Sequence, residues 1–425
     1  MCLRRLGENS TTERQFGRLL RNPKVTDEEI LATAAAQVGP RAAGRHVLAI
    51  QDTTELNFEA HAERTRGLGL VGNGIDHGFF MHPVLVADAG SGGGILGLAG
   101  AQLWCRTKRK DPNYRRQPIE EKESYRWLVG AEQAKTALAA AAMVTVIADR
   151  ESDIYDEFAR VPDAKTHLLT RACRDRALTS GICLFAATDA LPEKQRYTVK
   201  LPPLKSRAAR TATLALRFAP VTIRRPKGCP DQTLPDEISL HVVDVREVDV
   251  PNGATPVHWR LMTTHEVTTV KQAREIVAWY GRRWHIEQLF RTLKRQGLNL
   301  ESSLIEDAHG LQNLAALAVV AAVRILQLTL ARDGTTDQTA AEAFTEDEIV
   351  VLKHIQPTIE GKTAKQKNPF AKETLAWAAW LIARLGGWNP HAGQRPAGPI
   401  TMYHGLTTFE AIARGFAVAK DVYIR

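Results

Sequence analysis

Two short apolar runs in the first 150 residues of the chain are each followed by an aspartate. The run His46–Gln51 is followed by Asp52, and the run formed by residues 144–148 is followed by Asp149. Uninterrupted apolar runs rich in β-branched residues are typical of strands buried on both faces. Such a strand presents the residue after it at the carboxyl edge of the sheet. We expect Asp149 there, and Asp52 either there or in an Asx-turn that closes a hairpin.

Further strand-like segments surround these two. Residues 77–88 and 93–106 read as two strands of an antiparallel start to a sheet, with His77 and His82 at strand ends and without a chemical role. From about residue 164 to 257 the pattern consists of strands joined by Pro, Gly and basic loops. A β-rich block that interrupts an α/β pattern suggests an inserted subdomain.

Helical periodicity dominates the remainder. Residues 279–294 read as one helix, and residues 311–332 read as a helix that is apolar nearly all round and buried against the sheet. From about residue 345 two further helices flank a Gly/Pro-rich loop. Residues 1–45 are polar and helical, with Thr26 or Asp27 as a helix cap.

One face of the helix at residues 279–294 is charged. Tyr280, Arg283 and Glu287 stand three and four residues apart, and Lys294 follows two turns later. Such spacing places all four on nearly the same side of a helix. The carboxylate can bind a metal or accept a proton, and the cations can hold phosphates. A solvated face of ion pairs explains the same spacing.

Composition narrows the class of partner. The chain has 425 residues, a formal net charge of +9 and 44% hydrophobic residues, which favours a globular protein with a polyanionic partner without establishing one. The basic segment 106–116 is either a phosphate-contacting or a merely solvated loop. Five cysteines without CxxC spacing indicate reduced thiols rather than a zinc site or a disulfide framework.

Targeting signals are not apparent in the sequence. The first 15 residues lack the apolar segment of a signal peptide, and the run 314–323 is too short to cross a bilayer. We expect a soluble, cytoplasmic protein with no membrane partner.

The pattern Tyr-x2-Arg-x3-Glu-x6-Lys resembles the YREK signature of the insertion-sequence-4 family of DDE transposases. The segments IQDTTEL and DRESDIYDEF resemble the first and second catalytic blocks of that family. The resemblance implies an α/β, RNase H-like catalytic core in which the three carboxylates bind Mg²⁺ or Mn²⁺. These metal-binding and catalytic residues are Asp52, Asp149 and Glu287.

The resemblance also implies DNA-binding roles. Tyr280, Arg283 and Lys294 would hold phosphates beside the scissile bond, and Arg171 matches a family arginine beside the cleavage site. Trp259 matches a tryptophan that stacks in the gap left by a flipped base, although a strand Trp is usually a core residue. The expected substrates are double-stranded transposon ends and target DNA, bound by a homodimer. The expected reactions are strand cleavage and strand transfer.

The resemblance divides the chain into five segments. They are a partial N-terminal DNA-binding domain (1–45), the first part of the core (46–163), the inserted β-rich subdomain (164–257), the second part of the core (258–344) and a helical C-terminal dimerisation module (345–425). Trp377, Trp380 and Trp388 of that module can equally form a small core of their own.

The sequence is compatible with two other functions. A glycoside hydrolase also uses paired carboxylates with aromatic residues, but that function would not explain the positive net charge or the cations beside Glu287. An N-terminally truncated, non-catalytic DNA-binding or inhibitory relative would retain the same motif residues.

Overall fold

The computed structural model describes residues 9–58, 67–72, 74–90, 92–106, 113–201, 209–390 and 395–423. Most of the basic segment predicted at residues 106–116 lies outside the described residues, so its role stays a prediction.

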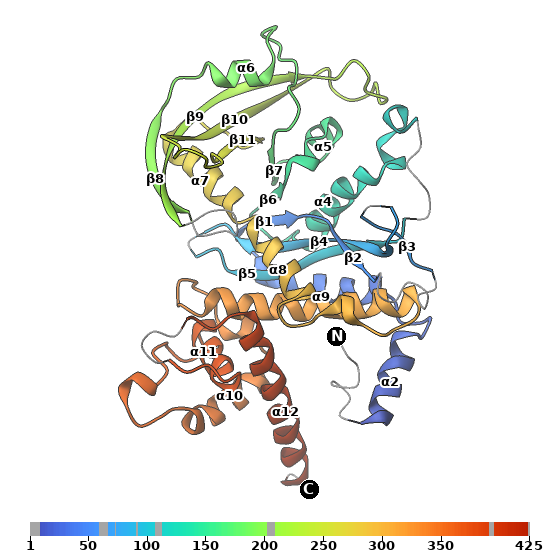
Figure 1. Ribbon diagram of the computed structural model, residues 1–425, viewed down its shortest axis with the longest axis vertical. Helices are drawn as coiled ribbons and strands as arrows, with labels where there is room; N and C mark the ends of the chain where they lie inside the picture. Colours follow the sequence, from blue (N-terminus) through green and yellow to red (C-terminus); the bar gives the residue numbers. More distant parts are fainter. Residues whose placement is uncertain are drawn as a thin grey trace.

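A mixed sheet runs through the protein (Figure 1). Among the described residues it has eleven strands in the order β2-β4-β1-β6-β7-β11-β10-β9-β8, with β3 and β5 also paired to β4. The strands are β1 His46–Gln51, β2 Thr54–Asn57, β3 Gly69–Leu70, β4 His77–Asp88, β5 Ile95–Trp104, β6 Met143–Ala148, β7 Thr166–Arg171, β8 Gln195–Leu201, β9 Arg210–Arg224, β10 Glu237–Val248 and β11 His258–Thr263.

The centre of the sheet is parallel and its flanks are antiparallel. Strand β6 pairs parallel with both β1 and β7, which puts the carboxyl ends of all three strands at one edge. Strand β4 pairs antiparallel with β1 and β5, which confirms the predicted antiparallel start. Strand β1 is almost entirely buried, as its continuous apolar pattern predicts.

The strands predicted for residues 164–257 are present, and they extend the core sheet. Strands β8, β9 and β10 form an antiparallel run that joins the parallel centre through β11 and β7. The upper part of Figure 1 shows these strands curving beside α6 and α7.

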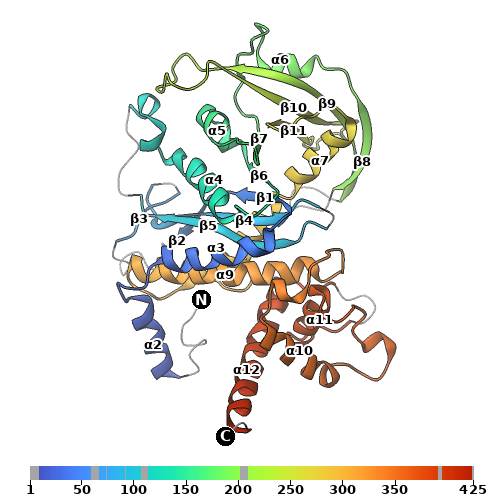
Figure 2. The same cartoon turned by 180° about the vertical axis from the view of Figure 1, so that it is seen from behind.

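Helices lie on both faces of the sheet. They are α2 Ser10–Leu20, α3 Asp27–Ala42, α4 Arg126–Ala137, α5 Tyr155–Arg160, α6 Leu184–Asp189, α7 Val270–Gly281, α8 Trp284–Lys294, α9 Ala308–Ala331, α10 Glu346–Ile359, α11 Leu375–Leu385 and α12 Pro399–Tyr423. Helix α3 begins after Thr26, whose side chain accepts a hydrogen bond from the Glu29 N–H and caps the helix. Figure 2 shows α3 lying along α9 on the side of β5.

Helix α9 is the central helix of the core and packs against β5, as predicted from its apolar pattern. Its 24 residues overlap the predicted segment 311–332 almost completely. By length and composition alone it passes for a membrane span, but 72% of its most apolar window is buried inside the protein. Burial of this kind is typical of the core helix of a globular protein.

The C-terminal helices α10 to α12 pack on the side of α9 that faces away from the sheet (Figure 1). Trp377 and Trp380 of α11 are buried, and Trp388 is partly buried against the same hydrophobic cluster. All three belong to the same hydrophobic cluster as α9, so they do not form a separate small core.

Candidate active site

The pairing of the parallel strands aligns three of the predicted site residues. Strand β1 pairs with β6 from His46 opposite Met143 to Ile50 opposite Ile147, and two further steps along this register bring Asp52 opposite Asp149. Strand β7 pairs with β6 up to Thr170 opposite Ala148, so Arg171 follows opposite Asp149. Neighbouring strands lie about 4.8 Å apart. Asp52, Asp149 and Arg171 therefore form one row along the carboxyl edge of the sheet, called the edge row below.

Glu287 reaches this row from a helix that differs from the predicted one. The single helix expected over residues 279–294 is wrong, because α7 ends at Gly281 and α8 begins at Trp284. At the break the Arg282 N–H donates to the carbonyls of Trp279 and Tyr280, which tightens the last turn of α7. Glycine weakens a helix because it has the most backbone freedom to lose. Tyr280 thus lies in the last turn of one helix, and Glu287 lies in the first turn of the next.

Arg283 lies at the break and joins the row to the helix. Its Nη1 donates to Asp52 Oδ2 at 3.0 Å, and its Nη2 donates to Glu287 Oε1 at 2.8 Å. Charge-assisted hydrogen bonds of this kind are stronger than neutral ones. One guanidinium therefore holds two of the three predicted catalytic carboxylates together.

The carboxylates of the site repel one another. Burial, together with the negative charges of Asp149 and Glu287, raises the pKa of Asp52 to about 6 against the opposing effects of the Thr53 N–H and Arg283. One arginine thus leaves the negative charge incompletely neutralised. A site of this kind favours an additional cation.

The donor set fits Mg²⁺ or Mn²⁺, which prefer carboxylate oxygens. The side chains are not arranged as a ready-made ligand cluster: among the described residues, no group of three His, Cys, Asp or Glu side chains stands in position to hold a metal ion. In place of such a cluster, the Arg283 guanidinium neutralises Asp52 and Glu287.

Aromatic and basic residues line the neighbouring surface. Tyr280 is buried and meets the ring of Trp259 edge-on, with 5.2 Å between ring centroids. Burial raises the pKa of Tyr280, so its hydroxyl stays protonated. Lys294, the last residue of α8, pairs with Glu301 at 3.5 Å, and the Arg171 guanidinium donates to the His258 carbonyl at 2.9 Å. Their predicted roles in DNA binding stay predictions.

Arg126, which the sequence patterns did not single out, connects the two loops that carry the aspartates. Its Nε donates to Thr53 Oγ1 at 2.8 Å, and its Nη2 donates to Glu151 Oε2 at 2.9 Å. Thr53 follows Asp52 in the chain, and Glu151 is two residues after Asp149. Arg126 is the first residue of α4 and has no spacing relation to either aspartate, so only the fold reveals it.

His82 also differs from its prediction. It lies inside β4 rather than at a strand end, is fully buried, and hydrogen-bonds Thr53 Oγ1 at 2.9 Å and Gln51 Oε1 at 3.1 Å. Burial lowers its pKa well below the usual value, so it is neutral. Its hydrogen bonds to Thr53 and Gln51 support the turn after β1.

A second set of buried polar groups supports Asp149. The Thr170 hydroxyl donates to the Asp149 carbonyl at 3.2 Å and lies 2.8 Å from the Ser152 hydroxyl, which donates to Glu157 Oε2 at 2.8 Å. Glu157 is fully buried, and burial raises its pKa to about 8, so it is protonated at neutral pH. These neutral side chains support the turn after β6 without adding charge to the site.

Comparisons with known proteins identify the family of this chain. The family model described as "Transposase DDE domain" matches residues 82–324. One solved structure that resembles the chain is the piggyBac transposase synaptic complex with hairpin DNA, with 11% sequence identity, a TM-score of 0.32, and coverage of 68% of this chain and 53% of that one. This chain thus spans about half the length of that protein.

Proposed function

Because this chain belongs to the family of proteins with a transposase DDE domain, we propose that it cleaves DNA strands at transposon ends and joins them to target DNA. The observation that carries the proposal is the edge row with Glu287 beside it: Asp52 and Asp149 follow adjacent parallel strands in register, and Arg283 links Asp52 to Glu287. We further propose that the core is of the RNase H type and of the insertion-sequence-4 group.

Asp52, Asp149 and Glu287 are the residues that would hold Mg²⁺ or Mn²⁺. Bound there, the ions would activate an attacking water or 3′-hydroxyl and neutralise the leaving oxygen of an in-line displacement at phosphorus. The mutual repulsion that raises the pKa of Asp52 supports this assignment, since a cation relieves it.

The protein side chains have separate tasks in binding the DNA. The planar guanidinium of Arg283 can bind a phosphate once it is released from Asp52 and Glu287. Lys294 presents a point charge to the phosphate. Tyr280 contributes a protonated hydroxyl, and Trp259 packs against it. In this proposal Arg171, which follows opposite Asp149, contacts the strand next to the scissile phosphate.

The test is metal-dependent nicking of double-stranded DNA that carries the flanking ends of the element. Wild type is compared with Asp149→Ala, and with Glu120→Gln as a control that removes an exposed carboxylate paired with Arg160. We expect Mg²⁺- or Mn²⁺-dependent cleavage that is lost in Asp149→Ala and kept in Glu120→Gln. Cleavage by Asp149→Ala at the wild-type rate would refute the assignment of the site.

A further inference from the structure

Strands β9, β10 and β11 carry a set of charged side chains on one face. The pairing places Asp244 of β10 opposite both Arg217 of β9 and Arg260 of β11. Two residues further along β10, Arg246 stands opposite His258. Residues two apart on a strand point to the same face, so all five side chains share it.

Asp244 is the buried centre of this set. Its side chain is fully buried, and its Oδ1 accepts from His258 Nε2 at 2.8 Å and from Arg260 Nε at 3.3 Å. A buried carboxylate with these partners fixes the orientation of the donors around it. The guanidinium of Arg260 also lies over the Phe185 ring, 4.5 Å from its centroid, and only 8% of the Arg260 side chain is exposed.

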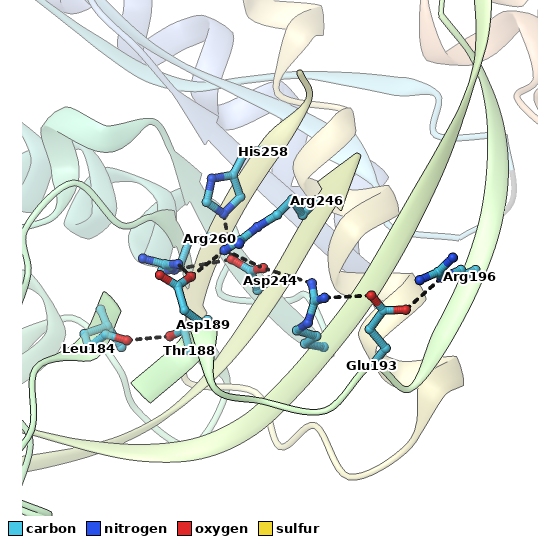
Figure 3. Close-up of polar contacts among 10 residues, drawn as sticks. Leu184, Thr188, Asp189, Glu193, Arg196, Asp244, Arg246, His258 and Arg260 are labelled. Atoms are coloured by element: carbon cyan, nitrogen blue, oxygen red, sulfur yellow. Dashed lines mark hydrogen bonds and ion pairs between the residues drawn. The ribbon is translucent and has the colours of Figure 1, made fainter. Parts of the chain in front are cut away.

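A second carboxylate, Asp189, lies at the surface of the set (Figure 3). It is the last residue of α6, and its Oδ1 accepts from Arg246 Nη2 and, at 2.6 Å, from Arg260 Nη2. Its side chain is 52% exposed. Two oriented guanidinium groups thus converge on one oxygen of an exposed carboxylate. Because solvent-exposed ion pairs contribute little to stability, Asp189 can be displaced from these arginines at low cost.

The same groups line a cavity of about 580 Å³ next to the candidate active site. Its ionisable lining consists of Arg171, Asp189, Arg246, Glu247, His258 and Arg260. Glu247 already pairs with Arg210, so Asp189 is the acidic group that faces the two arginines. Arg246 Nε is buried without an acceptor among the described residues, which leaves that guanidinium with unused donor capacity.

The cavity lies close to the edge row. Arg171 belongs to both, and Leu261, the neighbour of Arg260, pairs with Arg171 across β7 and β11. Adjacent strands are about 4.8 Å apart. If the scissile phosphate of a DNA strand lies at the edge row, a neighbouring phosphate of that strand would therefore lie at the cavity.

We propose that Arg246 and Arg260 form an additional binding site for a phosphate of the DNA backbone, which Asp189 occupies as a displaceable counterion while DNA is absent. Phosphate oxygens accept the same guanidinium donors as a carboxylate oxygen does. The buried Asp244 stays in place when DNA binds and keeps both arginines oriented. The inference rests on the proposed function, because it assigns the bound anion to DNA.

The experiment is equilibrium binding of a labelled duplex in EDTA, followed by fluorescence anisotropy between about 50 and 200 mM salt. Asp189→Asn is expected to tighten binding several-fold and to steepen the plot of log K against log salt by about 1, the contribution of roughly one phosphate contact. Arg246→Gln is expected to weaken binding and to flatten the slope by a similar amount.

Two matched controls separate the site from net charge. Glu193 also pairs with two arginines, Arg196 and Arg217, but does not line the cavity. Glu193→Gln therefore makes the same charge change as Asp189→Asn, and Arg196→Gln the same change as Arg246→Gln. If each control shifts affinity and slope as much as its partner, the effect is one of overall charge and the proposal is overturned.

Three further outcomes distinguish the source of the anion and the origin of a failure. If inorganic phosphate raises the melting temperature of Asp189→Asn while its DNA affinity stays at the wild-type value, the site takes a free anion and the DNA assignment is wrong. A wild type that binds and cleaves DNA while Asp189→Asn changes nothing overturns this inference alone. A wild type that binds no DNA overturns the proposed function as well.

Discussion

Replacing Arg283 by alanine should destabilise the metal-free protein more than the metal-loaded one. The change removes two charge-assisted hydrogen bonds, to Asp52 and to Glu287, each worth about 1.5–3 kcal/mol in a buried setting. The three side chains are 11%, 20% and 28% exposed, which reduces that sum through solvent screening. We therefore expect a loss of about 2–4 kcal/mol in the free energy of unfolding in EDTA.

A divalent cation should compensate for part of this loss. Without Arg283, Asp52 and Glu287 face Asp149 with no positive partner between them, and a bound ion would neutralise the same carboxylates. The assay is urea unfolding of both proteins, in EDTA and in excess Mg²⁺. We expect the difference in unfolding free energy between wild type and variant to shrink when Mg²⁺ is present.

The neighbouring arginine supplies the control. Arg282 donates at 2.7 Å to the carbonyls of Asp88 and Gly90 and pairs with no carboxylate at the site. Arg282→Ala should lower stability to the same extent in EDTA and in Mg²⁺. If the loss in Arg283→Ala is equally independent of Mg²⁺, the carboxylates around Arg283 are not a metal site and the reasoning fails.

Three further predictions concern the surroundings of the site. The pKa of Asp52 is about 6, above its usual 3.8, so its contribution to stability is full below pH 3.8 and is lost as the pH rises through 6. In EDTA, Asp52→Asn should therefore gain stability relative to wild type as the pH rises from 4.5 to 7.5. Urea unfolding measures this, and a difference that stays constant with pH would contradict it. Glu157→Gln should gain stability relative to wild type as the pH rises from 4.5 to 8, because the buried carboxyl, with a pKa of about 8 against its usual 4.5, contributes fully below pH 4.5 and loses that contribution as the pH rises through 8. Thermal melts at the two ends of this pH range test it, and a constant difference between variant and wild type would contradict it. Arg126→Gln should lower metal-dependent cleavage by about 10-fold by releasing the turn after Asp52 from the turn after Asp149; equal Mg²⁺ dependence of cleavage in variant and wild type would argue against this role.

Local sequence was sufficient to predict where the central strands end. Runs of apolar, β-branched residues specify buried strands through their own side chains, so the positions of Asp52 and Asp149 directly after β1 and β6 follow from the pattern. The helical character around Glu287 and the burial of α9 follow in the same way. The roles of these residues came from resemblance to a family, since spacing alone also fits a solvated face.

Other features depended on contacts between distant segments. The alignment of Asp52 with Asp149 depends on the parallel register of β1 and β6, and the cavity beside the edge row depends on Asp189 meeting Arg246 and Arg260, which lie 57 and 71 residues further along the chain. The break between α7 and α8 is another such feature, because Gly281 weakens the helix there while Arg283 gains two carboxylate partners, one of them 231 residues away. Periodicity reports which face of an element is buried, and only packing decides which other element covers that face. Charges that are ordinary along the chain therefore become a site when strand pairing brings them together.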